Sequence, residues 1–232
     1  TMNHPRILRE GLAGTIDDAR ARLEALPPDE RAGEKGLFYD AVIRSLRAAV
    51  AFANRYAALA RTLAAEAATP ARRAELIEIA EICERVPEYP ARTFAEAVQC
   101  VYFIHLISQI ESGGNSISLG RIDQILHPYY AADLAAGRIT PEAARERLAL
   151  LFLKTNEIWN VLEEAFIPGG EGTEGKTTQN VTVGGMNARG EDATNALSEI
   201  GLDAFADVRT VQPNFGRSEE HTSELQSPSV IS

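Results

Sequence analysis

The sequence contains few of the residues that define several protein classes. Its 232 residues include only two cysteines, Cys83 and Cys100, and one tryptophan. The cysteines are far apart in apolar helical patterns, so they indicate buried thiols rather than the disulfide framework of a secreted domain. No Cys-x-x-Cys pair or His-Glu-x-x-His helix is present to bind zinc. We therefore expect two unreactive thiols, no metal site and a cytoplasmic location.

Positive charge and long apolar runs are also scarce. Lysine and arginine total 23 against 33 aspartate and glutamate residues, which gives a net charge of −10. Nucleic-acid binding requires a basic face, so we expect no nucleic-acid partner. No stretch approaches the roughly 18 consecutive apolar residues that would span a membrane, and residues 1–6 contain no apolar signal region. We therefore expect no membrane association.

The first two-thirds of the chain is predicted to be helical. Across residues 35–66, apolar side chains recur in steps of three and four, the period of one helix face. A Thr-Pro pair at 69–70 begins a second helix. Thr93 and Glu96 form a capping box before a third helix. Over residues 98–110 this helix is apolar nearly all round, which predicts burial inside a large structure.

The rest of the chain mixes helices and strands. We expect helices over residues 121–135 and from Pro141 onward, then a strand over 180–184, a helix over 192–206 and a second strand from Thr210. A glycine-rich stretch precedes the first strand, but its spacing does not fit a phosphate-binding loop. The fold class is therefore α/β, with helices predominant in this chain.

Residues 111–124 place polar side chains directly after the apolar helix. Glycines at 113, 114 and 120 allow the backbone to approach a ligand or another strand closely. The polar residues of this segment are Glu111, Asn115, Ser116, Ser118, Arg121 and Asp123. Buried polar groups must be hydrogen-bonded, so the segment is either a structural network or a substrate site.

Several blocks of sequence, in this order, resemble one family. They are residues 55–60 (RYAALA), 75–83 (ELIEIAEIC), 90–97 (PARTFAEA), 116–130 (SISLGRIDQILHPYY), 179–185 (QNVTVGG), 192–195 (DATN) and 212–213 (QP). Over roughly residues 7–216 the chain is similar to the glycyl radical enzymes, the family of pyruvate formate-lyase. The resemblance implies that the chain is part of their α/β barrel, from its N-terminal half.

The resemblance also implies a chemistry. In this family a radical stored on a glycine, and installed by a radical SAM activating enzyme, passes to a cysteine in the barrel. The resulting thiyl radical abstracts a hydrogen from a small-molecule substrate, and a barrel shields such a site from solvent. We expect the full-length protein to be a homodimer.

Both radical-bearing motifs of the family are missing from this chain. The family's radical cysteine lies in Gly-Cys-x-Glu, whereas Ile82 precedes Cys83 and Gln99 precedes Cys100. The Arg-Val-x-Gly-Tyr motif of the radical glycine is also absent. We therefore expect no catalytic residue and no bound cofactor here, and an inactive isolated chain.

The resemblance assigns a substrate-binding role to Asn115 and Ser116. Dehydratase-like members carry a His-Ser pair in the corresponding loop, of which Ser116 matches and Asn115 does not. An asparagine side chain can still hydrogen-bond a substrate hydroxyl or carboxylate. Together with GRIDQ at 120–124 and DATN at 192–195, this favours the dehydratase or lyase branch.

The end of the chain does not resemble this family. Residues 217–227 (RSEEHTSELQS) resemble an in-frame translation of a common sequencing adapter. We therefore divide the chain into residues 1–216, a partial pyruvate formate-lyase-like domain, and residues 217–232, an artefactual tail that we expect to be disordered.

Two other functions stay open at this stage. Within the family, the chain could belong to a formate acetyltransferase or a decarboxylase. Outside it, the chain could be a non-catalytic helical module that binds a partner through the apolar helix at 98–110.

Overall fold

A computed structural model describes residues 2–112, 117–158 and 179–218. The chain divides into two compact units, residues 2–112 and the part that follows Ser112, which we describe separately. In the described part, no helix is both long enough and apolar enough to cross a membrane.

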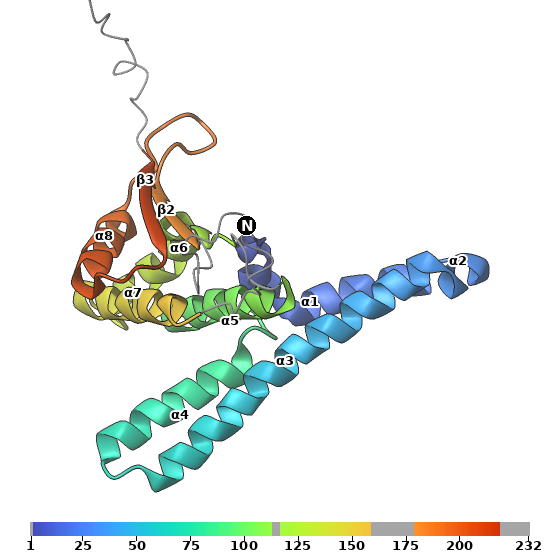
Figure 1. The fold of residues 1–232 in the computed structure, drawn as a ribbon, viewed down its shortest axis with the longest axis horizontal. Coiled ribbons are helices and arrows are strands. Elements are labelled where there is room, and N and C mark those ends of the chain that lie inside the picture. The colour runs from blue at the N-terminus through green and yellow to red at the C-terminus, as the bar shows by residue number, and fades with distance from the viewer. Residues whose placement is uncertain (1, 113–116, 159–178, 219–232) are drawn as a thin grey trace, which may run out of the picture. The chain divides into compact units, whose positions relative to one another are not determined.

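The first unit consists of helices. These are α1 (His4–Glu24), α2 (Pro28–Ala32), α3 (Glu34–Glu66), α4 (Pro70–Arg85) and α5 (Phe94–Ser112) (Figure 1). The three long helices predicted from periodicity and caps are confirmed as α3, α4 and α5. Thr69 caps α4 by accepting a hydrogen bond from the Arg72 backbone N–H at 3.2 Å.

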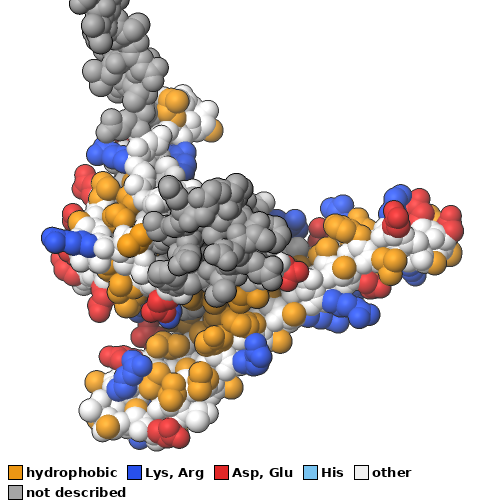
Figure 2. Space-filling view, in the orientation of Figure 1, with side chains coloured by type: hydrophobic (Ala, Val, Ile, Leu, Met, Phe, Trp, Pro, Cys, Tyr) orange, Lys and Arg blue, Asp and Glu red, His pale blue; other side chains and the backbone are white. Residues whose placement is uncertain are grey.

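Helices α3 and α4 form a hairpin in which α3 buries mainly small side chains. The buried residues along α3 recur every three or four positions: Ala49, Ala53, Ala57, Ala60 and Ala64. Larger apolar side chains on the same hairpin are exposed, including Tyr56, Leu59 and Leu63 on α3 and Ile77 and Ile79 on α4 (Figure 2). Small residues on α3 allow the two backbones to approach closely, and α4 contributes Leu76, Ala80 and Cys83 as its buried residues.

The capping box expected at the start of α5 is partly reproduced. The Thr93 hydroxyl accepts from the Glu96 backbone N–H at 3.2 Å, as predicted. The Glu96 carboxylate accepts from the backbone N–H of Arg92 at 2.6 Å and from the Arg92 guanidinium at 2.7 Å. Glu96 is buried, so these charge-assisted bonds fix the entry of α5.

Helix α1 is kinked at Gly11, which the sequence did not predict. Gly11 has φ 68° and ψ 173°, a conformation that essentially only glycine adopts. After the kink, the Leu12 N–H donates to the Pro87 carbonyl at 2.8 Å and the Ala13 N–H donates to the Glu88 carbonyl at 2.9 Å. Backbone carbonyls of the connection between α4 and α5 therefore replace the carbonyls of α1 as acceptors for these two N–H groups.

The second unit combines a small sheet with helices. Its elements are β1 (Gly120–Arg121), α6 (Ile122–Ala135), α7 (Pro141–Asn156), β2 (Asn180–Gly184), α8 (Ala196–Val208) and β3 (Asn214–Ser218) (Figure 1). Among the described residues, the strands pair in parallel in the order β1-β2-β3. This arrangement confirms the predicted class, helices with a small α/β portion.

One face of the sheet is apolar and packs on helices. Val181 and Val183 of β2 are buried on this face. Phe215 of β3 lies 5.6 Å from the Phe152 ring of α7 and 5.0 Å from the Phe205 ring of α8, measured between ring centroids. These aromatic contacts form the centre of the second core.

Two boundaries predicted for this region are wrong. Helix α8 begins at Ala196 rather than at residue 192, because Asp192 Oδ1 accepts from the Thr194 N–H at 2.9 Å and Asn195 then caps the helix. Strand β3 begins at Asn214 rather than at Thr210. A local turn sets the start of α8, and pairing with β2 sets the start of β3. Apolar periodicity reveals neither.

Strand β3 also continues past the expected domain boundary at residue 216. Arg217 pairs with Val183 and Ser218 pairs with Gly184, and the Gly185 N–H donates to the Ser218 carbonyl at 3.2 Å. Backbone hydrogen bonding of this kind does not depend on side-chain identity, so adapter-like residues can extend a strand. Residues 219–232 lie outside the described residues, and their assignment as a tail stays a prediction.

We predict different outcomes for two C-terminal truncations. Deleting residues 219–232 should change the free energy of unfolding by less than about 0.5 kcal/mol, as for neutral surface changes. Deleting residues 217–232 should lower it by about 1–2 kcal/mol, because the last β3 hydrogen bonds are lost. Thermal unfolding of both proteins provides the measurement, and a large loss in the shorter deletion would contradict the tail assignment.

Candidate functional site

The second face of the sheet is polar. Asn180 pairs with Asn214, and Arg121 pairs with Thr182, so in each pair both side chains lie on the same side of the parallel sheet. The Asn214 amide Nδ2 donates to Asn180 Oδ1 at 3.2 Å, and Asn180 Nδ2 donates to the Ser118 hydroxyl at 3.4 Å. A row of amide and hydroxyl groups therefore crosses the strands, which can hydrogen-bond a polar molecule.

Asp123 organises the carboxyl ends of β1 and β2. Its side chain is 1% exposed. Oδ2 accepts hydrogen bonds from the Gly184 backbone N–H at 2.8 Å and from the Ser198 hydroxyl at 2.6 Å, and Oδ1 accepts from the Gln124 N–H at 2.8 Å. A buried carboxylate is tolerated when donors surround it in this way. Asp123 therefore has a structural role: it ties the strand ends to α8.

The N-terminus of α8 is fixed by the same group of residues. The Asn195 side chain caps α8 and donates from Nδ2 to the Asp123 carbonyl at 3.4 Å. Gln124 Nε2 donates to the Ala193 carbonyl at 2.6 Å and to Asp123 Oδ2 at 3.0 Å. The loop between β2 and α8 is thus held against the start of α6, at the edge where the strands end.

Arg121 lies beside this network at the end of β1. Its Nη1 donates to the Met186 carbonyl at 2.8 Å. A Cβ atom added to Gly185 would lie 3.6 Å from Arg121 Cζ, so the guanidinium lies close to the backbone after β2. Nε and Nη2 are buried and have no hydrogen-bond partner among the described residues. The Arg121 guanidinium therefore has one hydrogen-bonded nitrogen and two buried nitrogens without a partner among the described residues.

The two cysteines are not arranged for chemistry. Burial raises the pKa of Cys83 to about 11 and that of Cys100 to about 12, so both stay protonated at neutral pH. Cys83 packs in an apolar cluster with Ala53, Ala57 and Phe103. The expectation of inert buried thiols is confirmed, because a thiol that stays protonated is a poor nucleophile.

The structure separates the polar segment at 111–124 into parts with different roles. Asn115 and Ser116, the predicted substrate-binding pair, lie outside the described residues. Asp123 belongs to the structural network, whereas Ser118 and Arg121 lie with the polar face of the sheet. Sequence reasoning did not single out Asn180, Ser198 or Asn214, because only the strand pairing and the α8 cap bring them to this edge.

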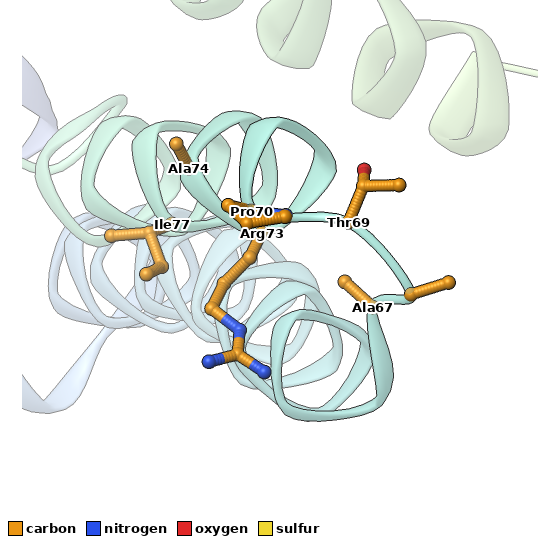
Figure 3. A pocket seen from close by; sticks show the side chains of 7 residues that line it. Ala67, Thr69, Pro70, Arg73, Ala74 and Ile77 are labelled. Carbon is orange, nitrogen blue, oxygen red and sulfur yellow. The ribbon is translucent and has the colours of Figure 1, made fainter.

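A hollow of about 350 Å³ lies elsewhere, at the turn between α3 and α4 (Figure 3). Its lining consists mostly of apolar side chains of the hairpin end, with Arg73 and Thr69 as its polar members. A substrate site typically directs several polar groups at one point. This hollow does not do so among the described residues, and we assign it no function.

Comparison with known proteins agrees with this architecture. The family described as pyruvate formate lyase-like matches residues 1–218. The (2S)-3-sulfopropanediol dehydratase of Klebsiella oxytoca is 36% identical over 213 residues, 91% of this chain and 26% of that protein. The isethionate sulfite-lyase of Nitratidesulfovibrio vulgaris is 37% identical over 204 residues, 86% of this chain and 24% of that protein.

A solved structure shows the same arrangement of elements. The glycyl radical enzyme of Archaeoglobus fulgidus superposes with a TM-score of 0.83 at 37% identity, over 94% of this chain and 27% of that chain. The chain thus spans about a quarter of the length of these relatives and has a part of their barrel fold. From the family match and these likenesses, the chain belongs to the pyruvate formate lyase-like family of glycyl radical enzymes.

Proposed function

We propose that this chain is the part of a glycyl radical dehydratase or lyase that precedes the radical cysteine and glycine, and that it is inactive alone. The observation that carries the proposal is the similarity over nearly the whole chain to a dehydratase and a sulfite-lyase. Neither Cys83 nor Cys100 lies in a Gly-Cys-x-Glu motif, which supports a catalytic centre elsewhere in the full-length protein. The whole enzyme would cleave or eliminate a bond in a small polar metabolite in the cytoplasm.

The chain's own residues would build one wall of the substrate site. The Ser118–Asn180–Asn214 row offers hydrogen-bonding groups on the open face of the sheet, and Asp123 holds the strand ends that support it. A glycyl radical on a residue beyond this chain, installed by a radical SAM activating enzyme, would pass to a cysteine that also lies beyond this chain, and the thiyl radical there would abstract the substrate hydrogen. We infer that the full-length enzyme is a homodimer.

We predict that Asn115 and Ser116 contact substrate in the full-length enzyme. Truncating either side chain to alanine should leave a substrate polar group unpaired at a cost of about 1–3 kcal/mol. The expected result is a loss of about ten- to hundredfold in kcat/KM. Steady-state kinetics of the anaerobically activated Asn115→Ala and Ser116→Ala enzymes provide the measurement.

Thermal unfolding of the same variants separates binding from a structural role. If the two side chains only tie the loop to Arg121 or Asp123, the variants should melt at a lower temperature while the folded enzyme keeps normal kinetics. Wild-type kinetics in both variants would show that the substrate-binding assignment is wrong.

The intact gene tests the proposed function directly. We expect its reading frame beyond Gly216 to encode Gly-Cys-x-Glu and then Arg-Val-x-Gly-Tyr. An uninterrupted frame that encodes neither motif would contradict the proposal and favour a non-catalytic helical module.

A further inference from the structure

We propose that the Nε and Nη2 edge of Arg121 binds an oxyanion, a carboxylate or a sulfonate, at the carboxyl end of strand β1. Binding of the oxyanion follows from the geometry of the described residues. Only the identification of its source as substrate rests on the proposed function.

The first argument is that Arg121 is held in place by one nitrogen only. Nη1 is engaged with the Met186 carbonyl, while Nε and Nη2 are buried without a hydrogen-bond partner among the described residues. No ion pair of the described part includes Arg121. Leaving a buried cationic donor unpaired is unfavourable, so an acceptor is expected at this edge.

The second argument is the shape of the available edge. Nε and Nη2 carry two parallel N–H groups, which match two oxygens of one carboxylate or sulfonate in a side-on, bidentate pair. A lysine could offer only a point charge there. The hydrogen bond to Met186 and the burial of Nε and Nη2 restrict the movement of the guanidinium, so the fork is oriented before any ligand arrives.

The third argument is that the nearby carboxylate is already occupied. Asp123 is two residues away, but its oxygens accept from the Gly184 N–H, the Ser198 hydroxyl and the Gln124 side chain. These donors hold the Asp123 carboxylate toward Gly184 and Ser198. The acceptor for Arg121 must therefore come from outside the described residues.

The fourth argument is the position of Arg121 at the edge of the sheet. Gly184 has φ +71° and Gly185 has φ +81°, conformations that side chains rarely adopt. Gly184 ends β2 and Gly185 follows it, so both lie with Arg121 at the carboxyl edge of the sheet, where ligands of parallel α/β sheets typically bind. The oxyanion would be the anionic group of the substrate or an aspartate or glutamate side chain from the rest of the enzyme.

Binding can be tested on the 232-residue chain with acetate and methanesulfonate as probes. We expect each probe, compared with chloride at equal ionic strength, to raise the melting temperature progressively with its concentration. In the wild-type chain, the Arg121 Nε–H resonance should shift to saturation in nitrogen-15 NMR and give the dissociation constant of the probe. The dissociation constant obtained from the melting temperatures should rise at least tenfold in R121Q, and it should also rise in R121K because the fork is lost. The control R189Q removes an exposed arginine that pairs with Glu191 and should bind like wild type.

The full-length enzyme then distinguishes the two sources. If the oxyanion is a substrate group, the full-length protein should also bind the probes, and R121K should raise KM with little change in melting temperature. If it is a protein carboxylate, the full-length protein should not bind the probes, and R121K should lower its melting temperature at unchanged KM. The proposal is overturned if neither probe stabilises the wild-type chain more than chloride does, or if the Nε–H resonance does not move. The gene-reading experiment is independent of all these results.

Discussion

Replacing Asp123 with alanine should lower the free energy of unfolding of the sheet-containing unit by about 3–5 kcal/mol. The substitution removes the acceptor for the Gly184 N–H and for the Ser198 hydroxyl, both of which are buried. Each buried donor left unsatisfied costs about 1–3 kcal/mol. The loss should be visible as a lower melting temperature and as faster hydrogen exchange in β2 and at the start of α8.

Two further variants make this prediction specific. Asp123→Asn keeps the size and one acceptor oxygen, so it should lose about 1–2 kcal/mol. Asp203→Ala removes an exposed carboxylate from α8 and should change stability by less than about 0.5 kcal/mol. Equal melting temperatures for Asp123→Ala and Asp203→Ala would show that the buried network does not hold the strand ends.

Replacing Gly11 with alanine should destabilise the helical unit by about 3–5 kcal/mol. The new Cβ would lie 2.2 Å from the Glu88 carbonyl oxygen and 2.8 Å from the Tyr89 carbonyl carbon, which are backbone atoms that cannot rotate away. The φ of +68° adds strain of about 1–3 kcal/mol for any residue with a Cβ. Relief of the clash would break the hydrogen bonds from Leu12 and Ala13 to residues 87–88.

Gly137→Ala is the matched control for Gly11→Ala. Gly137 has a nearly identical φ of +67°, but a Cβ there would meet nothing within 4 Å. The Gly137→Ala variant should therefore lose only about 1–2 kcal/mol of unfolding free energy, from the left-handed backbone alone. Chemical denaturation of both variants provides the measurement. Similar losses of stability in the two variants would mean that Gly11 is required for its left-handed backbone alone, and not for the close contact with the backbone of residues 88–89.

The helices could be predicted from the sequence because their signals are local. The alanine row of α3 repeats at helical spacing, and Thr69 caps α4 from the adjacent position. The kink in α1 could not be predicted, because Gly11 looks like an ordinary helical glycine until the 86–91 connection is placed beside it. Long-range backbone contacts decide that conformation.

The sheet and the candidate site depended even more on long-range contacts. Strand β1 has only two residues, too few for a period, and exists because it pairs with β2. The sequence showed that polar residues crowd the segment at 111–124, but both a structural and a substrate role fitted that pattern. Only the positions of Gly184 and Ser198 assign Asp123 to the structural role and leave Arg121 with a free edge.

Electron paramagnetic resonance of the full-length enzyme tests the central claim most directly. After anaerobic incubation with its radical SAM activating enzyme, the full-length protein should show a glycine-centred radical, and the 232-residue chain treated in the same way should show none. A full-length protein that never acquires the radical, or a radical on the 232-residue chain itself, would contradict this account.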